Sequence, residues 1–196
     1  MIKVEQPSLA VNDIALLKYT YRMQFSIIAS RTDTPDFIVS RVLNVARMTT
    51  GKKLRFLIIN CHGFYGKAPG STVEKGGFGL HLGTGVQRRD IPKFQALRGF
   101  VDNIWITACG TARQTNAGPV GERSGGDGLM FCSEMARASG AYVVAATTLQ
   151  DIQPNVPFGH VDDFEGVVLQ FGPNGNVVWQ HDYGRSWISA LLHGSN

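Results

Sequence analysis

The sequence predicts an α/β protein: a single three-layer domain with a mostly parallel central sheet, helices on both faces and a C-terminal β-hairpin. Apolar runs of strand length alternate with stretches of helical periodicity through most of the 196 residues. Such alternation is typical of parallel sheets, because a crossover between parallel strands usually carries a helix. No internal repeat and no linker divides the chain, so we expect one domain over residues 1–196.

The first half contains two expected strands with a helix between them. Residues 21–29 are an apolar stretch of strand length. Thr34 then offers an N-cap and Pro35 the first helical position, and apolar residues at helical spacing continue to about Met48. Residues 54–60 are almost continuously apolar, which is typical of a strand buried on both faces.

The second half repeats this alternation and then changes at the tail. In order, we expect a short strand at 78–82, a helix near 90–98, a strand at 101–107, a helix from 126 to 138 with Gly140 as its C-cap, and a strand at 142–146. Residues 166–171 and 176–181 flank a turn whose Asn-Gly pair is a strong hairpin signal. An amphipathic segment at 187–192 predicts a short final helix.

The composition is that of a globular protein and argues against several classes. An apolar fraction of 43% with 17% charged residues is that of a chain with a packed core. No apolar run approaches the roughly 18 residues that cross a bilayer, and the N-terminus lacks a signal-peptide core. We therefore expect no membrane association and a cytoplasmic location, although secretion without a signal peptide would leave no such pattern. The net charge of +4 comes from scattered basic residues, so no nucleic-acid partner is expected.

The cysteines and histidines give no sign of a metal or cofactor site. Three cysteines are too few for a disulfide framework, and none belongs to a CxxC pair. Cys61 points away from its neighbour on a strand and is expected to be buried, and Cys132 is expected in a helix core. The histidines other than His62 have no partners at metal-ligand spacing, and the acidic turn at 162–165 is expected to be solvated.

Two expected strands end in a chemically reactive residue beside a glycine. His62-Gly63 follows the strand at 54–60, and Cys109-Gly110 follows the strand at 101–107. The carboxyl ends of parallel strands meet at one edge of a sheet, where open α/β sheets build their sites. An imidazole near a thiol favours the reactive thiolate and can deliver a proton to a leaving amine. The pattern therefore predicts a Cys109/His62 catalytic dyad that requires no metal.

Glycine-rich loops follow both reactive residues. Residues 63–79 contain six glycines, and residues 110–128 form a second such loop. Long loops without secondary structure are usually functional or disordered in compact domains. Because both leave the strand ends that carry the dyad, we expect them to bind substrate.

With these motifs the chain resembles the caspase-like (clan CD) cysteine peptidases, which include caspases, metacaspases, legumain, gingipains, separase and bacterial CHAT-type proteases. The pattern is most similar to the bacterial members. The shared signature is an apolar strand ending in His-Gly and a later one ending in Ala-Cys, separated here by 109 − 62 = 47 residues against roughly 50 in caspases. The similarity covers residues 54–151, including the segments 126–129 and 141–146.

The resemblance implies a caspase-like fold and a cysteine endopeptidase that hydrolyses peptide bonds in a protein or peptide through a thioester. Cys109 would be the nucleophile, His62 the general acid, and the amides of Gly63 and Cys109 the oxyanion donors. It also implies a zymogen that is cut in the loop after the nucleophile, near Arg113 or Arg123, with or without an activating partner.

The sequence departs from caspases at the residue that helps to select aspartate. Thr107 stands where caspases carry a glutamine before Ala-Cys, so aspartate specificity is not expected. Relatives that cleave after Arg or Lys carry an acidic residue in the pocket for the P1 side chain, and Asp151 is the candidate here. We expect Thr107 and Asp151 to contact the substrate; the alternative is that Asp151 caps a turn beside Pro154.

Two other function classes stay open. A catalytically silent caspase-like module for protein interaction or signalling would have an ordinary thiol at Cys109. A doubly wound domain could instead bind a small molecule or nucleotide at the strand ends. No GxGxxG or GxxxxGK[ST] motif follows a strand, and Gly83-Thr84-Gly85 is too short to count as one.

Overall fold

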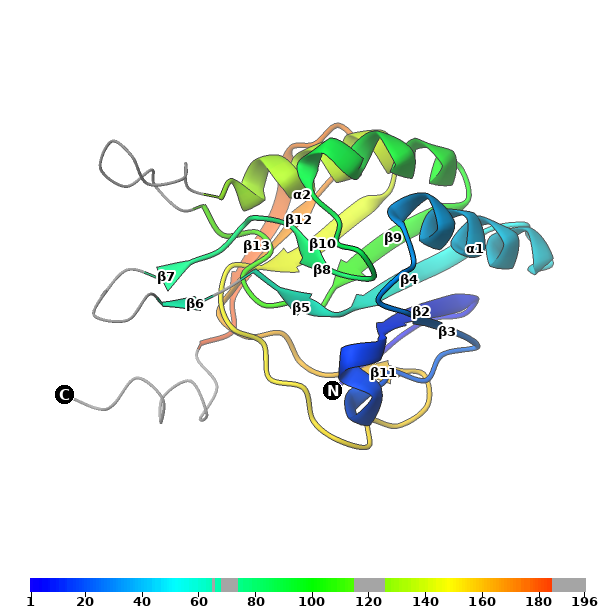
Figure 1. The fold of residues 1–196 in the computed structure, drawn as a ribbon, viewed down its shortest axis with the longest axis horizontal. Coiled ribbons are helices and arrows are strands. Elements are labelled where there is room, and N and C mark those ends of the chain that lie inside the picture. Colours follow the sequence, from blue (N-terminus) through cyan, green and yellow to red (C-terminus); the bar gives the residue numbers. More distant parts are fainter. Residues whose placement is uncertain (65, 68–73, 115–125, 185–196) are drawn as a thin grey trace.

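A seven-stranded sheet forms the centre of the molecule (Figure 1). The computed structural model describes residues 1–64, 66–67, 74–114 and 126–184. The strand order is β13-β12-β10-β9-β4-β2-β3; the five strands from β3 to β10 are parallel, β12 pairs antiparallel with β10, and β13 returns antiparallel to β12. These strands are β2 (Ser8–Asp13), β3 (Phe25–Ala29), β4 (Leu54–Asn60), β9 (Val101–Ile106), β10 (Tyr142–Ala146), β12 (Val167–Phe171) and β13 (Val177–Asp182). The predicted α/β class with a mostly parallel sheet is confirmed.

Short strands and four helical segments complete the described part of the chain. The short pairs are β1 (Ile2–Lys3) with β11 (His160–Val161), β5 (His62–Gly63) with β8 (Leu80–His81), and β6 (Gly66–Lys67) with β7 (Glu74–Lys75). The helical segments are the α-helices α1 (Pro35–Met48) and α2 (Gly128–Ser139) and the 3₁₀ helices η1 (Ile14–Tyr19) and η2 (Arg88–Leu97).

The two α-helices begin and end where local chemistry predicts. Thr34 caps α1 by accepting a hydrogen bond from the Phe37 amide at 3.3 Å, and Asp127 caps α2 by accepting one from the Met130 amide at 2.9 Å. Gly140 ends α2 with a φ of 66°, a left-handed conformation that glycine adopts without steric cost. Both helix predictions are thus confirmed.

Three other predicted elements differ from the structure or lie outside the described residues. The helix expected near 90–98 is the 3₁₀ helix η2, which contains Pro92, and a proline inside a helix removes a backbone donor. The strand expected at 21–29 is shorter, beginning at Phe25. The helix predicted at 187–192 lies outside the described residues.

Strand β2, next to the edge strand β3, is one that the sequence pattern did not indicate. All six of its residues are buried, although half of them are polar. Two buried asparagines explain this: Asn60 donates a hydrogen bond to Asn12 Oδ1 at 2.8 Å, and the Asn12 amide group donates to the Tyr21 carbonyl at 3.1 Å. Buried polar side chains are tolerated when they are hydrogen-bonded in this way.

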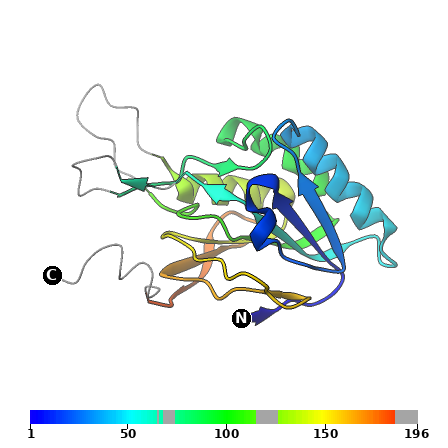
Figure 2. The same cartoon turned by 60° about the horizontal axis from the view of Figure 1, so that its bottom comes forward.

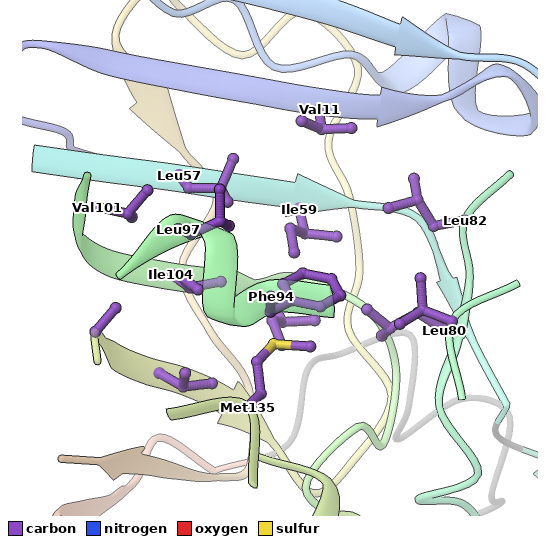
Figure 3. Close-up of a cluster of buried hydrophobic side chains, with 14 of the residues drawn as sticks. Val11, Leu57, Ile59, Leu80, Leu82, Phe94, Leu97, Val101, Ile104 and Met135 are labelled. Atoms are coloured by element: carbon purple, nitrogen blue, oxygen red, sulfur yellow. The ribbon is translucent and has the colours of Figure 1, made fainter. Parts of the chain in front are cut away.

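One face of the sheet carries the main hydrophobic core and packs against α1, η2 and α2 (Figures 1 and 3). Phe94 of η2, 2% exposed, lies in the middle of this core, with Met135 of α2 beside it. Strand residues that face them alternate along the chain, as in Leu57 and Ile59 of β4. The helices therefore hold the strands in place from one side.

The prediction of helices on both faces holds for one face, because no α-helix of the described residues covers the other. Extended segments cover the second face instead, including the segment after β10 that runs below the sheet in Figure 2. Crossovers between parallel strands are right-handed, so connections that step in one direction across the sheet lie on the same face. The connections β3-β4, β4-β9 and β9-β10 all step one way. Only β2-β3 steps back, and it is too short for more than the 3₁₀ helix η1.

Candidate active site

The pairing of β4 with β9 places His62 beside Cys109. In this parallel pair, Ile59 lies opposite Ile106, an offset of 106 − 59 = 47 residues. The same offset separates His62 from Cys109, each three residues beyond its paired isoleucine. The spacing seen in the sequence is therefore the register of two neighbouring strands, and both reactive residues leave the sheet at the same edge.

Gly63 packs directly on the backbone of Cys109. A Cβ atom added at Gly63 would lie 2.9 Å from the Cys109 carbonyl carbon and 3.0 Å from its nitrogen, and closer still to the carbonyl oxygen. Only a residue without a side chain permits this approach. The Cys109 N–H donates to no backbone carbonyl in the described part of the chain; the acceptor it faces is the sulfur of its own side chain.

The Cys109 thiol lies against Gln150, just after β10. The sulfur accepts a hydrogen bond from the Gln150 amide at 3.3 Å, and it can donate to the Gln150 carbonyl at 3.6 Å. Burial raises the pKa of the Cys109 thiol, and the nearby carboxylates of Asp151 and Glu165 raise it as well. Hydrogen bonds from the Gln150 and Cys109 backbone amides lower the pKa, but the net shift is upward. The direction of this shift is opposite to the one that a neighbouring imidazole would produce.

Thr107 and Asp151 line the same small enclosed cavity on the second face of the sheet. Its volume is about 10 Å³, and its lining is Tyr21, Thr107, Gln150, Asp151, Asp162, Asp163 and Phe164. Asp151 Oδ2 is buried and has no hydrogen-bond partner in the described part of the chain, so Asp151 does not cap a turn through this atom. Burial raises the pKa of the Asp162 carboxyl and of the Tyr21 phenol. The two predicted substrate contacts thus meet in an acidic pocket.

A second and larger cavity opens beside His62. It measures about 480 Å³ and is lined by Asp13, Ala15, Arg31, His62, Gly63, Phe64, His81, Gly83, Thr84, Gly85 and Gln87. His81 lies opposite His62 in the β5-β8 pair, and its ring lies against Phe64 with the ring centroids 3.5 Å apart. Burial lowers the pKa of His81, and the charge of His62 lowers it further.

Sequence reasoning missed Asp13, Arg31 and His81 as residues of the site. Asp13 ends β2, which the pattern did not indicate as a strand, so nothing marked it as a strand-end residue. His81 has no partner at metal-ligand spacing in the sequence, so the pattern did not indicate it as a site residue. Its place opposite His62 follows from the pairing of β5 with β8, and the only available signal was the short strand expected at 78–82.

The remaining predicted residues are placed as follows. Arg113 has a guanidinium that donates to the Thr147 carbonyl at 3.3 Å, and its own carbonyl accepts from the Gly128 amide at 2.9 Å. This backbone is folded into a turn and is not the extended form that a protease cleaves. Arg123 lies outside the described residues. Cys61 and Cys132 are buried in the core, as predicted.

Among residues 1–64, 66–67, 74–114 and 126–184, no three His, Cys, Asp or Glu side chains are grouped so that they could hold a metal ion. Within the same ranges, every helix is too short or too polar to cross a bilayer. No protein-family model, no curated protein and no solved structure matches this chain.

Proposed function

We propose that this protein is a cysteine endopeptidase that uses Cys109 as nucleophile and His62 as its proton-transfer partner. The observation that carries the proposal is the β4-β9 register, which sets both residues three positions past paired isoleucines at the carboxyl edge of the sheet. The packing of Gly63 on the Cys109 backbone supports it, because it holds the two strand ends against each other.

The reaction would begin from the protonated thiol. The thiol hydrogen bond to Gln150 breaks, and rotation about the Cα–Cβ bond of Cys109 turns the sulfur toward His62. His62 takes the thiol proton as the sulfur attacks the scissile carbonyl carbon. The C–N bond then breaks, His62 returns that proton to the leaving amine, and a thioester forms on Cys109. Water, deprotonated by His62, attacks the thioester and releases the carboxylic acid and the thiol.

We also propose that the fold is caspase-like. Its support is the mostly parallel sheet with the His-Gly and Ala-Cys motifs on adjacent strand ends. The described part of the chain lacks α-helices on the second face, so any relationship would lie in the sheet, the dyad and the three helical segments of the first face.

The acidic pocket supports cleavage after a basic residue. The carboxylate of Asp151 lies close enough to Cys109 to raise its pKa, and its buried Oδ2 has no donor in the described residues. A Lys or Arg side chain at P1 would supply both the charge and the donor. A cavity of about 10 Å³ holds about one water molecule, so the segment after Asp151 must move outward to admit such a side chain.

Activation by cleavage in the 110–128 loop stays part of the proposal. Because the Arg113 backbone is hydrogen-bonded within a turn, Arg123 is the better candidate for the cut. Intact mass before and after activity appears in solution tests this. A fully active protein that keeps its intact mass would show that activation does not require cleavage of this loop.

The experiment that tests the function is a fluorogenic peptide library varied at P1. The wild-type protein should cleave peptides with Arg or Lys at P1, and Cys109→Ala should abolish the cleavage. Cys132→Ala is the matched control, since it removes a thiol that is fully buried elsewhere in the core. Equal cleavage by Cys109→Ala and the wild type would disprove the assignment of the nucleophile.

A catalytically silent interaction module is the second candidate, and one observation favours it. The thiol is held by Gln150 and its pKa is raised, as in an ordinary buried cysteine. This candidate predicts no cleavage of any library peptide, and an alkylation rate of Cys109 at neutral pH no higher than that of a free cysteine.

A further inference from the structure

A cavity of about 480 Å³ lies beside His62, and most of the residues that line it take no part in the proposed dyad. It lies where the strand order reverses, because the chain steps from β2 to β3 in one direction and from β3 past β2 to β4 in the other. Crevices at the carboxyl ends of strands next to such a reversal are the usual ligand sites of open α/β sheets. Asp13 at the end of β2 and His62 after β4 both line it.

The two cavities fix the direction in which a substrate would cross the edge of the sheet. They share no lining residue: the acidic pocket contains Thr107 beside the Cys109 strand, and the large cavity contains His62 and Gly63. The acyl part of a substrate stays on the nucleophile, whereas the leaving amine must lie next to the proton donor. The leaving half of the substrate therefore belongs on the side of the large cavity.

We propose that this cavity binds the first two residues after the scissile bond and that Arg31 selects an acidic side chain there. The proposal rests on the peptidase function proposed above. A sphere of this volume is about 10 Å across, and two extended residues span about 7 Å, so the segment fits.

One wall of the cavity is flat and aromatic. The Phe64 and His81 rings lie against each other with their planes 32° apart. Burial lowers the pKa of His81, so near neutral pH this wall carries an uncharged imidazole. Such a wall offers van der Waals contact to a peptide backbone or an apolar side chain, and it leaves the selection of charge to other residues.

The two charged residues Asp13 and Arg31 line the cavity, but only one of them can bind a ligand. Asp13 is 5% exposed, and its carboxylate already accepts hydrogen bonds from the Ala15 amide at 2.9 Å and the Gly83 amide at 3.0 Å. Arg31 is exposed and makes no hydrogen bond or ion pair with any described residue. The charge that a ligand can reach is therefore the guanidinium, which favours a carboxylate.

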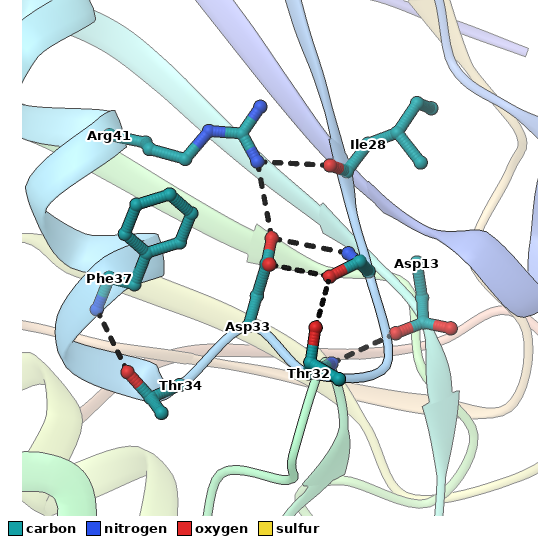
Figure 4. Close-up of polar contacts among 9 residues, drawn as sticks. Asp13, Ile28, Thr32, Asp33, Thr34, Phe37 and Arg41 are labelled. Atoms are coloured by element: carbon teal, nitrogen blue, oxygen red, sulfur yellow. Dashed lines mark hydrogen bonds and ion pairs between the residues drawn. The ribbon is translucent and has the colours of Figure 1, made fainter.

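The loop that carries Arg31 is held in place from both sides (Figure 4). Asp33 accepts hydrogen bonds from the Ser30 hydroxyl at 2.5 Å and from Arg41 at 3.2 Å, and the Arg41 guanidinium also donates to the Ile28 carbonyl at 3.0 Å. The Asp33 carbonyl accepts from the Thr84 amide at 2.9 Å, and Thr84 also lines the cavity. A free side chain on a fixed loop is suited to reading the charge of a ligand.

The test uses quenched peptides that share Arg at P1 and carry Glu, Gln or Lys at the first two positions after the scissile bond. The wild type should cleave the Glu peptides about fivefold faster than the Gln peptides in kcat/KM, as expected for one exposed ion pair. Arg31→Glu should reverse the order and favour Lys. Arg89→Ala is the matched control, because Arg89 is an exposed arginine that does not line the cavity, and its Glu-to-Gln ratio should equal that of the wild type.

The outcomes separate this inference from the function on which it rests. If the wild type cleaves no peptide at all, the peptidase function fails and the subsite fails with it. If it cleaves but the Glu-to-Gln ratio is one, or is unchanged by Arg31→Glu, only the subsite is refuted. A second readout uses Cys109→Ala protein and the dipeptide amides Phe-Glu and Phe-Gln in titration calorimetry. Tighter binding of Phe-Glu that is lost with Arg31→Glu supports the subsite, and equal binding of the two fragments refutes it.

Discussion

Replacing Gly63 by alanine should damage both the fold and the site, because this residue touches the backbone of the proposed nucleophile. The added Cβ would meet the Cys109 carbonyl carbon at 2.9 Å and its nitrogen at 3.0 Å, and its carbonyl oxygen more closely still. All three are backbone atoms, so no side-chain rotation relieves the contact. Overpacking of this kind costs about 1–3 kcal/mol of unfolding free energy, which is a loss of about 2–12 °C in Tm at about 2–4 °C per kcal/mol for a chain of this length.

The effect on activity should exceed the effect on stability. The β5 strand and the Cys109 turn must separate by up to about 1 Å, and a displacement of that size costs about a hundredfold in rate. Denaturant unfolding and kcat/KM on the best library peptide measure the two effects. Gly51→Ala is the matched control: nothing lies within 4 Å of a Cβ at Gly51, so stability and activity should be close to wild type. A Gly63→Ala protein as stable and as active as Gly51→Ala would refute the proposed contact between the two strand ends.

Three further predictions concern the core and the titrating groups. Phe94→Ala should lower the unfolding free energy in urea by about 3–5 kcal/mol, because it empties the middle of the core beneath η2; a loss below about 1 kcal/mol would contradict that packing. Asp151→Asn should speed the alkylation of Cys109 at pH 8, since removing a nearby negative charge lowers the pKa of the thiol; an unchanged rate would show that the carboxylate does not act on the thiol. Asp162→Asn should be more stable than the wild type, by a margin that grows from pH 4 to pH 7. Burial raises the pKa of this carboxyl in the folded state, so its contribution to stability is present below its unfolded value and is lost as the pH rises through the folded value. Urea midpoints at the two pH values check this, and a margin that shrinks would contradict it.

The sequence predicted the sheet wherever strand residues are apolar on both faces. The strand at 54–60 was placed at the bounds observed, because its burial requires near-continuous apolar character. The opposite case is β2, whose buried Asn12 and Asp13 are satisfied by partners far along the chain, such as Asn60 and Gly83. A local pattern cannot show those partners, so the strand was missed.

The placement of the helices depended on a property of the whole sheet. The sequence shows where helices form, but the face that each one covers is set by strand order and by the handedness of the crossovers. Because three connections step the same way, α1, η2 and α2 share one face. The prediction of helices on both faces assumed an alternation of direction that this strand order does not have.

The sequence indicated the reactive pair and two residues of the acidic pocket, Thr107 and Asp151, but not the rest of the candidate site. His62 and Cys109 have the same separation as the paired isoleucines of β4 and β9, and this separation can be read directly from the sequence. Arg31, His81 and Asp162 also line the two cavities, but they lie on separate loops and short strands that only the folded chain brings together. The direction of the Cys109 pKa shift could not be predicted either, because burial and the carboxylates at 151 and 165 act on the thiol only in the folded chain.

The most direct test of the dyad is covalent labelling with a peptidyl acyloxymethyl ketone that carries Arg at P1, followed by peptide mapping in a mass spectrometer. The account predicts one label per chain, placed on Cys109, with labelling strongly slowed in His62→Ala and unaffected in Cys132→Ala. Labelling of Cys61 or Cys132 in its place, or labelling of Cys109 at the same rate with and without His62, would contradict the assignment of Cys109 and His62 as a catalytic pair.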